Sequence, residues 1–128
     1  MITCRARLQF AGRSFVLFYL VEGGDCPTED FLAGLAGGDV AAHKKATLAL
    51  QRLAENGPPR NMERGKQLER DLWELKSHQV RLFYFVRGGR AFFTHGIKKK
   101  RDEIPPRELE RARRLRDAFL AQGQEVEV

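Results

Sequence analysis

Residues 72–101 constrain the fold of this chain most strongly, because their pattern predicts three consecutive strands of an antiparallel sheet. Apolar and polar residues alternate over 73–76, and 80–86 is rich in β-branched and aromatic residues. Gly88 and Gly89 supply the two flexible positions that a tight hairpin turn needs, and 90–97 forms the third strand. The stretch ends in four consecutive cations at 98–101.

The two faces of this predicted meander differ in composition. Two-residue loops would set Lys76 opposite Arg81 and Glu74 opposite Phe83, and side chains alternate between faces with a period of two. One face then mixes charges with aromatic rings: Glu74, Lys76, Arg81, Phe83, Phe85, Phe92, Thr94 and Lys98. The other face is almost wholly apolar and is the predicted core: Trp73, Leu75, Leu82, Tyr84, Val86, Phe93 and Ile97. Cations for phosphates beside rings for unstacked bases are typical of an RNA-binding sheet, and the alternative is an ordinary face covered by another element.

Composition predicts one soluble cytoplasmic domain spanning residues 1–128. A length of 128 residues suits a single hydrophobic core, and no apolar run approaches the length of a membrane span. Cys4 and Cys26 lie far apart without metal-ligand spacing, so neither a disulfide framework nor a metal site is expected. Residues 1–56 carry balanced charges, and the net charge of +6 therefore falls in the second half. A polyanion or an acidic protein should approach there.

The rest of the chain predicts two helices before the meander and one after it. Residues 2–22 are extended, either as a hairpin or as one strand preceded by an arm at 1–12. A short helix opens at Pro27, and Asp39 is a candidate cap for an amphipathic helix over 40–55. Residues 60–70 predict a loop or a single turn, Pro105-Pro106 starts the last helix, and 122–128 is a frayed tail. The order β-α-α-β-β-β-α predicts an α+β fold, with two helices on one sheet face and the other face open.

Three strings in this order carry a family resemblance. LWELKSHQVRLFYFV, THGIKKK and PPRELERA resemble RelE/HigB-type toxins, in the phage-derived branch of the RelE/ParE superfamily, and the resemblance runs over about 15–120. It implies a RelE-like fold and a toxin of a type II toxin–antitoxin module that cuts mRNA on the ribosome without metal or cofactor. It also implies a co-expressed antitoxin, expected to be a helix-turn-helix protein. That antitoxin would cover the open face and the last helix and alone contact operator DNA.

Two other functions remain compatible with these residues. Gyrase-poisoning relatives share the scaffold, so the fold does not establish RNA cleavage. A non-catalytic module that binds nucleic acid or an antitoxin is the second alternative.

RNA can be cut without a metal when its own 2′-hydroxyl attacks the adjacent phosphate. The reaction needs a base, cations for the dianionic phosphorane and an acid for the leaving oxygen. The resemblance implies that Arg81 contacts the phosphate and that Lys98 and Lys99 bind it or donate a proton. Lys76, Phe83 and Phe85 are expected to bind RNA on the mixed face, and Lys100 and Arg101 to contact ribosomal RNA.

Two residues make the acid–base assignment ambiguous. Glu74 stands where the best-known toxins carry a lysine, and it is a candidate general base or a structural partner of Lys76 or Arg81. Strict alternation puts His95 on the core side with Phe93, which predicts a buried or edge histidine, although a register shift would reverse the face.

Overall fold

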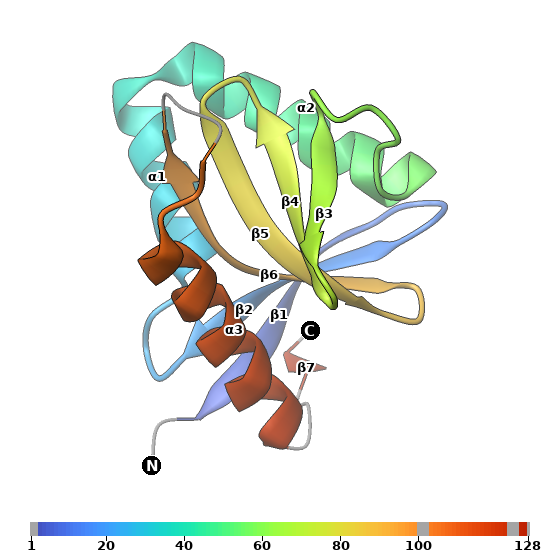
Figure 1. The fold of residues 1–128 in the computed structure, drawn as a ribbon, viewed down its shortest axis with the longest axis vertical. Coiled ribbons are helices and arrows are strands. Elements are labelled where there is room, and N and C mark those ends of the chain that lie inside the picture. Colours follow the sequence, from blue (N-terminus) through green and yellow to red (C-terminus); the bar gives the residue numbers. More distant parts are fainter. Residues whose placement is uncertain (1–2, 100–102, 123–125, 128) are drawn as a thin grey trace.

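The computed structural model describes residues 3–99, 103–122 and 126–127, and it forms one mixed sheet with three helices (Figure 1). The strands lie in the order β3-β4-β5-β6-β2-β1-β7. In chain order the elements are β1 (Cys4–Ala11), β2 (Val16–Glu22), α1 (Pro27–Gly38), α2 (Val40–Asn56), β3 (Gly65–Glu69), β4 (Leu72–Ser77), β5 (Val80–Arg87), β6 (Arg90–Lys98), α3 (Pro106–Ala121) and β7 (Val126–Glu127). None of the described helices is both long and apolar enough to cross a membrane.

The predicted meander is present as β4, β5 and β6. Lys76 lies opposite Arg81 and Glu74 opposite Phe83 across the first hairpin. Phe85 lies opposite Phe92 across the second. These three pairings confirm the register predicted from the two-residue loops.

The alternation of β6 breaks at Thr94, where a β-bulge inserts one extra residue. Phe93 pairs with Tyr84 but His95 pairs with Phe83, so Thr94 has no partner of its own in the ladder. Every later residue of β6 therefore faces the side opposite to the one predicted. Ile97, predicted in the main core, instead packs beside Phe83 on the other face. The prediction for this end of the strand was wrong because strict alternation does not anticipate a bulge.

Other parts of the sheet also differ from the prediction. Residues 65–69, predicted as loop, form the edge strand β3 against β4. Residues 4–11 pair with β2, so the N-terminal segment is a hairpin strand, and 126–127 in the predicted tail form the short strand β7 beside β1. The sheet is mixed, because β2 runs parallel to β6 and β1 parallel to β7.

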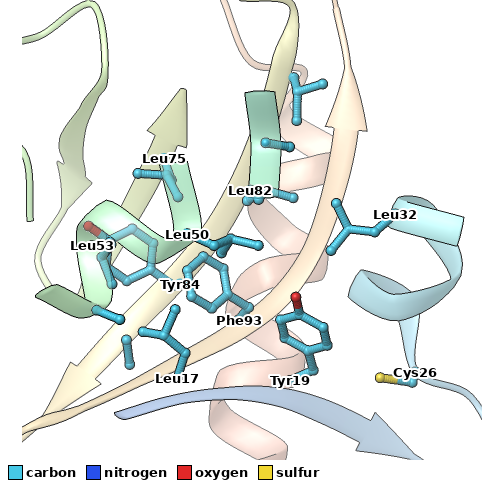
Figure 2. Packing of buried hydrophobic residues seen from close by; sticks show 14 of the residues in the cluster. Leu17, Tyr19, Cys26, Leu32, Leu50, Leu53, Leu75, Leu82, Tyr84 and Phe93 are labelled. Atoms are coloured by element: carbon cyan, nitrogen blue, oxygen red, sulfur yellow. The ribbon is translucent and has the colours of Figure 1, made fainter. Parts of the chain in front are cut away.

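Helices α1 and α2 cover one face of the sheet, as predicted. Figure 2 shows the core that they enclose, in which Leu32 of α1 and Leu50 and Leu53 of α2 meet side chains of β2, β4, β5 and β6. Asp39 begins α2 as predicted, since its carboxylate accepts a hydrogen bond of 3.1 Å from the backbone N–H of Ala42.

Helix α3 covers the other face, which was predicted to be open. Figure 1 shows it crossing the sheet on the side away from α2. Its Leu115 and Phe119 pack on Phe85 and Phe92, and its Ala112 packs on Phe83. Phe83 and Phe85 are 0% exposed, so their rings form a second core and offer no surface on which bases could stack. Packing against α3 therefore explains why the mixed face carries three phenylalanines.

Candidate active site

The polar part of the α3 face is a row of side chains that crosses four strands. Lys66 of β3 lies opposite Glu74 of β4, which lies opposite Phe83 of β5, which lies opposite His95 of β6. Directly opposed residues share a face of the sheet, so these four side chains are neighbours on the face that α3 covers. The row therefore places the polar side chains of Lys66, Glu74 and His95 beside the buried ring of Phe83.

Glu74 is a buried carboxylate beside a cation. Its side chain is 0% exposed, and the Nζ of Lys76 lies 3.7 Å from its Oε1. Neither carboxylate oxygen receives a hydrogen bond from the described residues. A buried charge needs a close counter-charge, and Lys76 is the one that the described residues supply. Lys76 is 11% exposed, so it links the buried acid to the surface.

Arg81 lies directly opposite Lys76 and is held by main-chain oxygens. Its Nη1 donates to the carbonyl of His78 and, at 3.0 Å, to the carbonyl of Val80. These contacts fix the guanidinium at the β4–β5 turn, and the residue is 6% exposed. Arg81 and Lys76 thus form a pair of adjacent cations at one end of the α3 face. Such a pair has the charge and donors that a phosphate group requires.

Lys98 and Lys99 have different surroundings. Val80 of the α2-side core lies opposite Lys98 in the ladder, and the Nζ of Lys98 lies 2.9 Å from Oδ2 of Asp39. The prediction that Lys98 shares a face with Glu74 was therefore wrong, and the bulge at Thr94 is the reason. The backbone N–H of Lys99 donates to the carbonyl of Gln79 at 2.8 Å, which brings Lys99 to the turn that holds Arg81.

His95 lies on the α3 face and not with Phe93. Its ring is 4.8 Å from that of Phe83, its Nδ1 is 3.1 Å from Oγ1 of Thr94, and its Nε2 is 3.3 Å from Oε1 of Glu108. Burial lowers the pKa of His95 to about 3, and the charges of two arginines of α3 contribute. The imidazole is therefore neutral at neutral pH, so the contact with Glu108 is not an ion pair. The prediction of a buried histidine is confirmed, and the predicted face is wrong.

The edge of the site is tied to its surroundings by arginine–carboxylate pairs. Arg113 of α3 donates to Glu69 at 2.6 Å, and this hydrogen bond holds the pKa of Glu69 below its ordinary value. Arg87 of β5 binds both oxygens of Asp71 and lowers the pKa of that carboxyl in the same way. The β3–β4 hairpin is thereby anchored both to α3 and to β5.

Sequence reasoning missed Lys66, because the strand that carries it was predicted as a loop. The period-two signal over residues 65–69 is short, with Leu68 the one large apolar residue. Lys100 and Arg101, predicted to contact ribosomal RNA, lie outside the described residues. Among the residues that are described, no three His, Cys, Asp or Glu side chains cluster in a way that could hold a metal ion.

Comparison with known protein families identifies a family that matches this sequence. The sequence model of a family described as phage-derived protein Gp49-like (DUF891) matches residues 34–117. This range is more than half of the chain and contains α2, β3 to β6 and most of α3, together with the row across the α3 face. A search of curated proteins returns no match.

Proposed function

We propose that this chain, which belongs to the phage-derived Gp49-like family, is a toxin that cuts mRNA. The family is a type II toxin family of the RelE/HigB kind. Its cognate antitoxin would be a helix-turn-helix protein, and ribosome-bound mRNA would be the substrate. The observation that carries the proposal is the adjacency of Lys76 and Arg81 beside the turn that also holds Lys99.

The proposed chemistry is attack by the 2′-hydroxyl of the RNA on its own adjacent phosphate. The new bond joins the 2′-oxygen to phosphorus as the hydroxyl proton passes to water. The bond to the 5′-oxygen breaks as that oxygen takes a proton from the ammonium group of Lys99, and the products are a 2′,3′-cyclic phosphate and a 5′-hydroxyl. Arg81 would contact the phosphate through its guanidinium group, and Lys76 and Lys99 would stabilise the dianionic phosphorane. These three residues carry our assignment of the reaction.

Glu74 receives a positioning role in this proposal. A general base must lie within hydrogen-bonding reach of the hydroxyl proton, and a side chain with no exposed surface does not meet that requirement. Its carboxylate is instead close enough to Lys76 to orient the ammonium group. We therefore assign Glu74 the role of a structural partner of Lys76 and not that of a general base.

The burial of the site favours a second candidate, a binding module without catalysis. Glu74 and His95 are both 0% exposed, and α3 lies over the row that contains them. A chain that only binds RNA or an antitoxin would need no accessible acid or base. Gyrase poisoning, the third function compatible with this fold, has no residue-level observation in its favour.

Induced expression in a bacterial host separates these functions. The proposal predicts growth arrest with new cleavage sites in abundant mRNAs, detected by primer extension, and loss of both effects in Arg81→Ala. Arrest without mRNA cleavage but with altered DNA supercoiling would indicate gyrase. The absence of arrest would indicate a binding module.

A further inference from the structure

A groove of about 880 Å³ lies between α2, the loop over residues 57–64 and the end of β4. Its lining is strongly basic, with five Lys or Arg residues against a single acidic residue, Glu63. The cations are Lys45, Arg52, Arg60, Arg64 and Lys76. The site described above does not use the first four of them.

Among the described residues, these four cations have no ion-pair partner of the kind that three arginines of α3 have. Arg113 pairs with Glu69, Arg114 with Glu22 and Arg116 with Asp117, all at 2.9 Å or less. Lys45, Arg52, Arg60 and Arg64 are exposed, and within the described parts of the chain none of them forms an ion pair. Like charges that line one groove repel one another, so a bound polyanion would stabilise this arrangement.

The position of the groove favours RNA over an unrelated anion. Lys76 is among the residues that line the groove, while its side chain faces the candidate active site. Ser77 at the end of β4 and His78 of the β4–β5 turn complete the groove at that end. The carbonyl of His78 accepts a hydrogen bond from Arg81. A strand that leaves a phosphate at Arg81 would thus pass over this turn directly into the groove.

We infer that the groove binds the nucleotides of single-stranded RNA that flank the phosphate at Arg81, an inference that rests on the proposed function. The described residues that line the groove include no Phe, Tyr or Trp, and His78 is the one aromatic side chain among them, so the lining offers little for bases to stack on. Recognition there is through the phosphates. Binding is therefore insensitive to base sequence and sensitive to salt.

Fluorescence anisotropy with a labelled 2′-O-methyl RNA of about twelve nucleotides tests this inference, because methylated RNA binds but cannot be cut by 2′-hydroxyl attack. The groove variant is Lys45→Glu/Arg52→Glu. Its matched control is Lys44→Glu/Arg70→Glu, which changes the net charge equally at exposed positions outside the groove.

The groove variant should bind this RNA at least about tenfold more weakly, and its log–log salt slope should fall by about 1.4, or about 0.7 for each lost phosphate contact. The control should stay within about threefold of the unchanged protein. Equal losses in the two variants would overturn the inference. So would a groove variant that keeps its RNA affinity but loses affinity for poly-glutamate, because the groove would then serve an acidic polypeptide.

The outcome is separable from that of the proposed function. Arg81→Ala should lose cleavage while still binding methylated RNA through the groove. If the unchanged protein cuts no RNA, the proposed function fails, and the comparison of the two charge-reversal variants still decides what the groove binds.

Discussion

The Nζ of Lys76 lies 3.7 Å from Oε1 of Glu74 on one face of the sheet, where the lysine reaches the surface and the glutamate is buried. Glu74 is 0% exposed, whereas Lys76 reaches solvent beside Arg81. The carboxylate can therefore influence a bound phosphate only through the lysine. In the proposed function, Lys76 would therefore contact the RNA and Glu74 would only position Lys76.

Replacing Glu74 should consequently impair cleavage through Lys76 alone. Glu74→Gln should lower the single-turnover cleavage rate about tenfold, or about 1.4 kcal/mol, and Lys76→Met should lower it about 100-fold or more. The double variant should be no slower than Lys76→Met, because both changes remove the same oriented ammonium group. Multiplied losses in the double variant would contradict the positioning role. Circular dichroism of each variant controls for folding.

Lys98 and Lys99 form a natural matched pair, because they are adjacent in the chain and differ in their surroundings. Lys99→Ala should slow cleavage about tenfold or more, since Lys99 is held at the turn of Arg81. Lys98→Ala should leave the rate within about twofold and change the stability little, because its partner is the exposed carboxylate of Asp39. If Lys98→Ala slowed cleavage more than Lys99→Ala did, the change of face at the bulge would not determine which lysine takes part in cleavage.

The buried His95 should make the protein less stable in mild acid. Its pKa is about 3 in the folded state and about 6.5 when unfolded, so between these values the unfolded chain takes up a proton that the folded chain does not. Stability therefore falls as the pH drops from 6.5 towards 3. Glu108, Arg111 and Arg114 of α3 are the charged groups near the ring.

Denaturant unfolding at two pH values measures this effect. The free energy of unfolding should be about 2 kcal/mol lower at pH 5 than at pH 7, and His95→Gln should remove most of that difference. His78→Gln, at an exposed position in the β4–β5 turn, should retain it. An unchanged pH dependence in His95→Gln would mean that the ring does not stay neutral in the folded protein.

Gly96 follows the bulge and faces α1, where it has no room for a side chain. A Cβ there would lie 2.5 Å from Cδ2 of Phe31 and 2.6 Å from Cδ2 of Leu82. Gly96→Ala should therefore destabilise the protein by about 1–3 kcal/mol. Gly34→Ala, in α1 with nothing within 4 Å of its Cβ, should instead stabilise it by up to about 1 kcal/mol. Thermal unfolding of the two variants tests both values.

The meander was predictable because its signals are local. Alternation over residues 73–76 and the Gly88-Gly89 turn define the strands, and two-residue loops then fix that Lys76 meets Arg81. Asp39 was likewise recognisable as a helix cap from its own position in the sequence.

The faces after Thr94 were not predictable, because one inserted residue reverses them and nothing in the alternation marks the insertion. The burial of Phe83 and Phe85 depends on where α3 packs, which is a long-range property of the chain. Sequence periodicity alone therefore could not predict whether these two rings are exposed or buried.

The central claim, that Arg81 belongs to a metal-independent RNA-cutting site, is tested most directly by the chemistry of the product ends. The measurement incubates purified protein with ribosome-bound mRNA and identifies the chemical groups at the new RNA ends. We predict 2′,3′-cyclic phosphate and 5′-hydroxyl ends, which attack by the 2′-hydroxyl leaves, and we predict that these products vanish in Arg81→Ala but persist in the exposed control Arg70→Ala. Products with 5′-phosphate ends, or equal cleavage by Arg81→Ala, would contradict the account.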